Sequence, residues 1–347
     1  MLTSVPLQLH RLLLVLLTLG ISTLGGYSQT SGRSVAELWA TYHESDSDSI
    51  QIEALSALSS AYVKGNLDSA LLLGETALER AQAQGFRSLE ANAYVSMGEV
   101  YDLAGQIEPA LNNINRGLQI FLEIRDEKGS ARAYNSRGLA RLYANMELEQ
   151  ARKDFIEAKF IAEKTHDLAL LAKIFHNLAQ THQHLQELPE ALKAYLRARN
   201  LKDSLVAIGY PGISAREQVS TYNNLSVFYQ SVFQFDKARE TSEKALELTP
   251  EEELGRRAVI LLTLGIIEHE DSNYNAALGH LDESLQLAQQ GGFTAYQPNI
   301  YNAIGNAHLE LKSVEAASDN YELALEILKD INLPDVKAGV VVDQADM

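Results

Sequence analysis

The sequence contains no cysteine among its 347 residues. Disulfide bonds, thiolate metal sites and cysteine catalysis are therefore excluded. Proline is scarce too, with seven residues, and no stretch rich in proline, glycine and serine divides the chain. These absences favour one continuous body over domains joined by flexible linkers.

Positive charge is also in short supply. The chain has 29 lysine and arginine residues against 46 aspartate and glutamate residues, which gives a formal net charge of −17 at pH 7. Proteins that bind the phosphate backbone need clustered basic side chains. Nucleic acid is therefore not an expected partner.

The signatures of the common enzyme classes are missing. The sequence has no G-x-x-x-x-G-K-[ST], no H-E-x-x-H and no G-x-S-x-G. His182 and His184 lie two positions apart, so on a helix they point about 200° apart and do not share a metal ion. The acidic stretch EHEDSN, residues 268–273, is predicted to be a solvated edge, with a weak divalent-cation site as the alternative. We therefore predict no enzymatic activity, no catalytic residues, no cofactor and no metal site.

The N-terminal segment 1–28 has the layout of a secretory signal. Arg11 precedes an apolar run that ends in small residues, and a cut is predicted between Ser28 and Gln29. The run from Leu12 to Gly26 would form about 22 Å of helix, shorter than the roughly 30 Å hydrocarbon core of a bilayer. We therefore expect a periplasmic or secreted protein. A retained inner-membrane anchor facing the periplasm and a buried N-terminal helix are the alternatives.

A sequence pattern repeats beyond residue 50. A large residue is followed by a small one at a close-packing position, and an Ala-Leu pair comes in the second half of each copy. The successive small residues are Gly98, Gly138, Ala179, Ser226, Gly265 and Gly305, with a weaker first copy around Leu58. Their spacing is about 40 residues except for one longer step, and such periods indicate a solenoid, in which each unit buries its apolar face against its neighbours.

Each copy divides into two helical stripes. In YVSMGEVYDLAGQIEPALNNINRGLQI, Tyr94, Met97, Gly98 and Tyr101 share one helical face, and a second stripe follows the break at Gly105. The order of an aromatic, Leu-Gly, Tyr, and then Ala, aromatic and Ala resembles the tetratricopeptide repeat family. The resemblance covers roughly residues 50–330 in about seven copies.

The resemblance implies an all-α protein, a right-handed superhelical solenoid of about seven helix-turn-helix units. The spacing departs from the family's usual period of about 34 residues. It is similar to the long-helix bacterial type, such as the extracytoplasmic repeat region of bacterial sensor and regulator proteins. On this basis we expect a signal peptide at 1–28, a lead-in at 29–49, the solenoid at 50–333 and a C-terminal tail at 334–347.

The longest step, between Ala179 and Ser226, contains LKDSLVAIGYPGISAREQ, whose Gly209-Tyr210-Pro211-Gly212 is a turn signal. It predicts a longer helix followed by a loop. The insertion is either merely tolerated or a loop that closes over one mouth of the superhelix.

In the family that this chain resembles, the first helix of each unit lines a concave groove. The resemblance assigns polar residues to that groove, and amides, arginine and lysine can hydrogen-bond a peptide backbone. The groove residues expected to bind a partner are Asn92, Arg132, Asn135, Lys173, His176, Gln180, Asn223, Asn299, Asn302 and Asn306. The alternative is that these residues are polar only because they meet water.

Two further expectations concern the last copies. Val259, Leu262 and Ile266 form an apolar patch in the groove that receives either a partner side chain or a neighbouring element such as the C-terminal tail. Gly305 is expected on the packing stripe, where a leucine would cost roughly 1 to 3 kcal/mol or more. Asn302→Ala, at a surface site, should change stability by no more than about 0.5 kcal/mol.

The leading hypothesis is an exported, non-enzymatic scaffold that binds a peptide segment or a partner protein in the groove. The alternative is a sensory input module, truncated or split, of a bacterial histidine kinase or transcriptional regulator.

Overall fold

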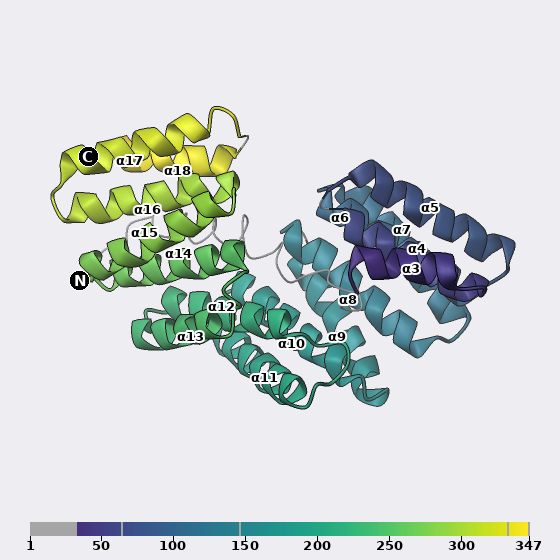
Figure 1. Cartoon of the computed structure of the whole chain (residues 1–347). Helices are drawn as coiled ribbons and strands as arrows, with labels where there is room; N and C mark the ends of the chain where they lie inside the picture. The colour runs from purple at the N-terminus through teal and green to yellow at the C-terminus, as the bar shows by residue number, and fades with distance from the viewer. Residues whose placement is uncertain (1–32, 64, 146, 332, 346–347) are drawn as a thin grey trace. The chain divides into compact units, whose positions relative to one another are not determined.

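The computed structural model describes residues 33–345 apart from positions 64, 146 and 332 (Figure 1). This part of the chain is built from helices and contains no strand. The predicted signal peptide lies outside the described residues. Within them, no helix combines the length and apolar character that a membrane span requires.

The helices fall into two compact units, residues 33–214 and 215–345. The N-terminal unit contains α3 (Val35–Glu44), α4 (Asp48–Tyr62), α5 (Leu67–Ala83), α6 (Arg87–Leu103), α7 (Ile107–Glu123), α8 (Glu127–Tyr143), α9 (Leu148–Lys164), α10 (Leu168–His184) and α11 (Leu188–Ala207). The C-terminal unit contains α12 (Ala215–Ser231), α13 (Phe235–Glu247), α14 (Leu254–Glu270), α15 (Tyr274–Gln290), the 3₁₀ helix η2 (Thr294–Tyr296), α16 (Gln297–Glu310), α17 (Val314–Ile327) and α18 (Pro334–Ala345).

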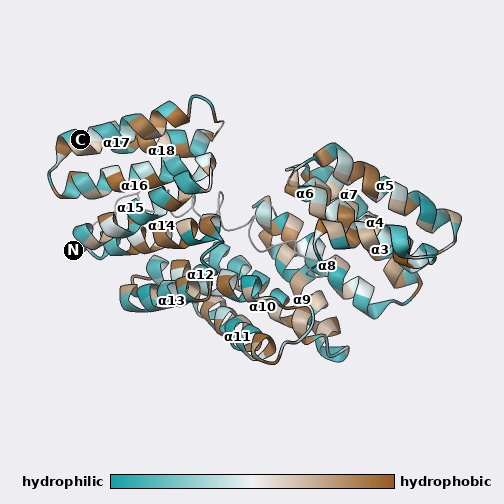
Figure 2. Cartoon of the chain, viewed as in Figure 1, coloured by the Kyte–Doolittle hydropathy of each residue, from teal (hydrophilic) through white to brown (hydrophobic). Residues whose placement is uncertain are grey.

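From α4 to α17 the helices pack as consecutive pairs, beginning with α4 and α5 and ending with α16 and α17. These are the seven predicted helix-turn-helix units, so the all-α repeat architecture is confirmed. Hydrophobic and hydrophilic residues alternate along the helices (Figure 2), as expected where one face of each helix packs and another meets solvent.

The tight turns within pairs need a residue in the left-handed region. After α6, Gly105 has φ of 73°, and the Gln106 N–H donates to the Tyr101 carbonyl over 2.8 Å. Glycine adopts this conformation without steric cost. The predicted break at Gly105 is therefore the turn between α6 and α7.

The small residues of the repeat allow close helix packing. A Cβ added at Gly98 would lie 2.5 Å from Cγ1 of Ile114, and one added at Gly265 would lie 2.5 Å from Cγ of Leu281. Real Cβ atoms do not approach other heavy atoms so closely. In each case the obstructing side chain belongs to the second helix of the same pair, so the small residue of the first helix sets the spacing within the unit.

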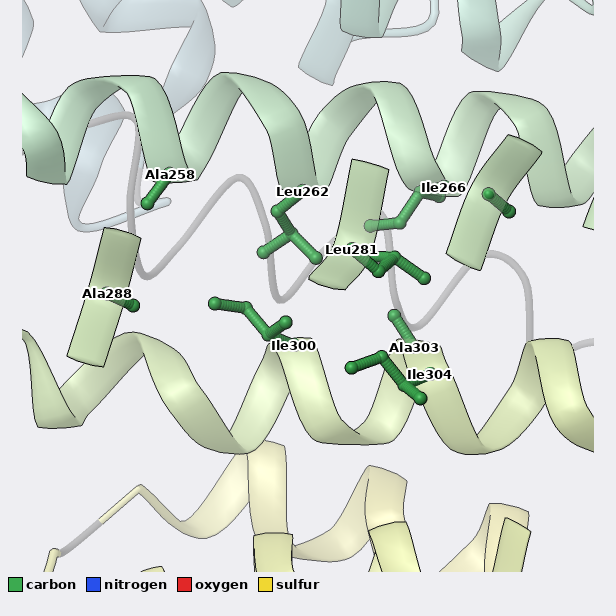
Figure 3. Packing of buried hydrophobic residues seen from close by; sticks show 9 residues of the cluster. Ala258, Leu262, Ile266, Leu281, Ala288, Ile300, Ala303 and Ile304 are labelled. Carbon is green, nitrogen blue, oxygen red and sulfur yellow. The ribbon is translucent and has the colours of Figure 1, made fainter. Parts of the chain in front are cut away.

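The apolar patch predicted for the groove of the sixth copy is instead part of the core. Leu262 and Ile266 are only 4% and 8% exposed, and both belong to a cluster with Ile300 and Ile304 of α16 and Leu281 of α15. Figure 3 shows the α14 side chains pointing toward those of α16. Of the two predicted occupants of this patch, the structure shows a neighbouring element, which is α16 and not the C-terminal tail.

The predicted solvated acidic edge at EHEDSN is wrong for Glu268, although Ser272 and Asn273 at its end are exposed. Glu268 is only 5% exposed, and its carboxylate accepts hydrogen bonds from Arg239 of α13 over 2.6 and 3.1 Å. Arg239 also donates to Asp271 over 2.8 Å. The hydrogen bond from Arg239 lowers the pKa of Glu268. The contacts of Arg239 with Glu268 and Asp271 also connect the end of α14 to the preceding helix pair.

The segments outside the repeat also form helices. The predicted lead-in contains α3, where Ser34 and Glu37 form a capping box and Leu38 is fully buried. The insertion before residue 215 lengthens α11 to 20 residues and ends in a loop with Gly209 and Gly212 at positive φ, as predicted. The expected C-terminal tail forms α18, which packs against α16 and α17.

Candidate functional site

Within each unit, the first helices of successive pairs contact one another directly: α4, α6, α8 and α10 in the N-terminal unit, and α12, α14 and α16 in the C-terminal unit. We call the face that carries the predicted groove residues the inner face. Five of those residues are less than 9% exposed, namely Asn135, His176, Gln180, Asn223 and Asn302. The other five are half-buried, namely Asn92, Arg132, Lys173, Asn299 and Asn306. The inner face is therefore polar but largely shielded from water.

Hydrogen bonds connect the inner face of one helix with that of the next. Arg132 of α8 donates to Oδ1 of Asn92 in α6 over 2.9 Å. Asn177 of α10 donates to Oδ1 of Asn135 in α8, also over 2.9 Å. The structure thus gives Asn92, Arg132 and Asn135 an internal role, which the sequence pattern did not reveal.

Helix α6, which carries Asn92, also carries a buried carboxylate. Glu99 of α6 is 4% exposed and accepts a hydrogen bond of 2.6 Å from Oγ of Ser136. The pKa of Glu99 is raised to about 7, mainly by burial and also by the charge of Asp102, while Ser136, Arg132 and Lys173 act in the opposite direction. The Glu99 carboxyl group therefore changes charge near neutral pH. Lys173, a predicted groove residue, contributes its charge to this balance.

His176 occupies the corresponding inner face of α10. Its ring meets that of Tyr195 edge to face, with centroids 6.1 Å apart. Burial and the nearby charge of Lys202 hold the pKa of His176 well below its usual value. His176 is therefore neutral at pH 7 and offers one donor and one acceptor, not a charge.

Several inner-face amides have a side-chain oxygen without a donor in the described part of the chain. Oδ1 of Asn223, Oε1 of Gln180 and Oδ1 of Asn302 are buried and have no hydrogen-bond donor among the residues that the structure describes. A buried polar atom without a partner is destabilising by roughly 1 to 3 kcal/mol. In a folded protein, each such atom calls for an explanation, such as a bound water, an ion or a functional role.

The inner face of α16 is covered from within the chain. Asn302 and Asn306 both donate through Nδ2 to Oδ2 of Asp343 in α18, over 2.8 and 3.1 Å. Oδ1 of Asn306 accepts from the Tyr321 hydroxyl over 2.6 Å. Asn302 is thus buried, which corrects its assignment as a surface site. Asn299, half-buried on the same helix, lies three positions before it.

Sequence reasoning placed the inner-face residues on the right helices but missed their partners. Ser136 and Asn177 were overlooked because each lies one position after a predicted groove residue. Asp343 lies outside the repeats, where no periodicity points to it.

Comparison with known proteins agrees with this geometry. The sequence profile of the tetratricopeptide repeat family matches residues 217–290 and 256–330. That region comprises helices α12 to α17, apart from the first two residues of α12.

Solved structures of similar fold extend over more of the chain. A signal transduction ATPase with numerous domains from Pyrococcus horikoshii, which has a tetratricopeptide repeat sensor, is 14% identical with a TM-score of 0.66; the match covers 90% of this chain and 49% of that one. The quorum sensor NprR from B. thuringiensis is 15% identical with a TM-score of 0.63, covering 85% and 80%. A Rap protein complexed with competence and sporulation factor is 16% identical with a TM-score of 0.60, covering 85% and 79%.

At these identities the structural matches show a shared fold, while the sequence profile identifies the repeats themselves. Residues 217–330 therefore match the tetratricopeptide repeat family, and the chain shares its fold with these solved structures over 85 to 90% of its length.

Proposed function

We propose that this protein is a non-enzymatic scaffold that binds an extended polypeptide segment on its inner faces. The observation that carries the proposal is a buried amide oxygen without a donor in the described part of each unit, at Gln180 in the N-terminal unit and at Asn223 in the C-terminal unit. A peptide backbone presents an N–H at each non-proline residue, and an amide oxygen is its natural acceptor. Binding would remove the cost of leaving these atoms unpaired.

The neighbouring inner-face groups suit the same ligand. The guanidinium of Arg132 and the ammonium of Lys173 have donors for peptide carbonyl oxygens. Neutral His176 can accept or donate without requiring a charged partner. A mixture of donors and acceptors matches a peptide backbone better than it matches a phosphate or a metal ion.

Peptide selection tests the proposal. Peptides selected from a random display library on the full-length protein should protect backbone amides of first helices, such as α10 or α12, in hydrogen exchange. Protection confined to second helices such as α9 or α13 would place binding on another face and would contradict the proposal.

Replacing an unpartnered amide should leave stability nearly unchanged. For Gln180→Leu and Asn223→Leu, we expect the free energy of unfolding to stay within about 0.5 kcal/mol of the wild type or to rise, because each change removes an unpaired buried oxygen. Chemical unfolding measures the effect.

Asn177→Leu is the matched control, because the side-chain amide of Asn177 donates a hydrogen bond within the protein. It would leave Oδ1 of buried Asn135 without its donor, so we expect a loss of about 1 to 3 kcal/mol. Equal losses in all three variants would show that the unpartnered amides serve the fold and not a ligand.

Export forms a second part of the proposal. The apolar run within residues 1–28 supports a signal that directs the chain to the periplasm or outside the cell, with cleavage after Ser28. Sequencing the N-terminus of the mature protein tests this. A chain that starts at Met1 in the envelope fraction would favour the retained anchor.

A sensory input module is the second candidate function. Two proteins of similar fold are described as a quorum sensor and as a protein with a tetratricopeptide repeat sensor, which favours this alternative at the level of fold alone. The test is a neighbouring reading frame that encodes a kinase or a transcriptional regulator. Co-purification of its protein product with this chain would support the alternative.

A further inference from the structure

The C-terminal helix α18 packs against α16 and α17 through both apolar and polar contacts. We call the surface of α16 and α17 that it covers the seat. Val336 and Val340 are 3% and 0% exposed and pack in a cluster with Tyr321 and Leu328. Further along the same helix, Asp343 places one carboxylate oxygen between the side-chain amides of Asn302 and Asn306. Positions i, i+4 and i+7 lie on one helical stripe, so α18 presents two valines and one carboxylate to the seat.

The two amides form a site for a carboxylate. Both Nδ2 atoms donate to the same oxygen of Asp343, although they come from successive turns of α16. Hydrogen bonds to a charged acceptor are stronger than those between neutral groups. Asn302 keeps its Oδ1 without a donor in the described part of the chain, so the seat retains hydrogen-bonding capacity that α18 does not use.

Helix α18, which covers the seat, has few features that stabilise it. Helix α18 has 12 residues, near the length below which isolated helices are marginal in water. Only Val336 and Val340 are buried in it. Its interior residue Gly339 would meet no atom within 4 Å if it carried a Cβ, so that glycine lowers helix stability without serving any close approach.

We propose that the seat formed by α16 and α17 is a binding site for a partner helix that bears a carboxylate, and that α18 occupies it until such a helix displaces it. The partner helix would carry branched apolar residues at i and i+4 and an aspartate or glutamate at i+7, as α18 does. This site is separate from the peptide-binding inner faces around Gln180 and Asn223, and neither proposal depends on the other.

A competition experiment on the full-length protein tests the inference. The probe is a fluorescently labelled synthetic peptide with the sequence of residues 333–345, LPDVKAGVVVDQA. In the chain, Asp343→Ala removes the charged contact and should loosen α18, so the probe should bind about tenfold more tightly than to the wild type. Gly339→Ala should favour the helical form of α18 and weaken probe binding about fivefold.

Two controls make the result specific. A probe whose own aspartate is replaced by alanine at the position of Asp343 should bind the Asp343→Ala protein about tenfold more weakly than the unaltered probe does, because it lacks the carboxylate. Amide exchange of α18 should quicken in Asp343→Ala and slow in Gly339→Ala, which shows that the substitutions act on this helix.

Equal probe affinity in all three proteins would overturn the inference, whether or not exchange of α18 changes. A concentration-dependent dimer of the Asp343→Ala protein would identify a second copy of the chain as the occupant, and would also overturn the proposal of a partner helix.

Discussion

Gly305→Leu is expected to lower the stability of the C-terminal unit by about 3 kcal/mol, at the upper end of typical overpacking costs. A Cβ at this position would lie 2.5 Å from Cε1 of Tyr321, whose side chain is fully buried. The ring has to move, and its hydroxyl would lose the hydrogen bond to Asn306. The gain in helix propensity, about 1 kcal/mol, does not offset these losses.

Chemical unfolding of the full chain measures this effect, together with amide exchange in α16 and α17, because repeat proteins can unfold in parts. Gly279→Leu is the matched control. Gly279 is exposed in the middle of α15, and an added Cβ would meet no atom within 4 Å, so we expect a gain of up to about 1 kcal/mol. Similar losses for both substitutions would contradict close packing at Gly305.

The second large effect concerns Glu99 and pH. Its pKa is about 7 in the folded chain, against an ordinary value of 4.5. Between these values the folded state binds more protons than the unfolded state, so stability falls as pH rises from about 4.5 to about 7. The full shift corresponds to a loss of roughly 3 kcal/mol.

Glu99→Gln removes this titration while keeping an acceptor for Ser136. We therefore expect Glu99→Gln to be roughly 3 kcal/mol more stable than the wild type at pH 8, with little difference near pH 4.5. Burial also raises the pKa of Glu270 to about 7, so only the difference between variant and wild type isolates Glu99.

Unfolding free energies at pH 4.5 and pH 8 provide the measurement. Glu79→Gln, at an exposed position of the same unit, makes the same charge change and should leave the slope of the wild type unaltered. A Glu99→Gln protein with that same slope would show that folding does not raise the pKa of Glu99, and would contradict this prediction.

Periodicity predicted the helix pairs well because packing within a pair is local. Gly98, Gly265 and Gly305 each meet a side chain of the second helix in their own pair, within the same copy of the repeat. Such contacts recur with the period, so a single sequence reveals them. The break at Gly105 follows for the same reason.

Contacts between copies were harder to predict. Leu262 and Ile266 looked like groove residues because the helical stripe tells which way a side chain points, but not whether the next helix covers it. Glu268 accepts a hydrogen bond from Arg239 in the preceding helix pair, and Asn302 donates one to Asp343 beyond the last repeat. No local pattern links these pairs, so acidic and amide side chains appeared solvated when they were paired and buried.

The candidate site illustrates the same limit. Sequence placed polar residues on the first helices, but only the structure separates amides that serve the fold, such as Asn135, from amides with an unused oxygen, such as Gln180. That distinction is what turns a polar surface into a specific binding hypothesis.

The most direct test is the dissociation constant of a display-selected peptide for the wild-type, Gln180→Leu and Asn223→Leu proteins, each measured by titration calorimetry on the full chain. If the inner faces bind the peptide backbone, at least one leucine variant should bind roughly tenfold more weakly while its stability matches the wild type. Unchanged affinity in both variants would contradict the account.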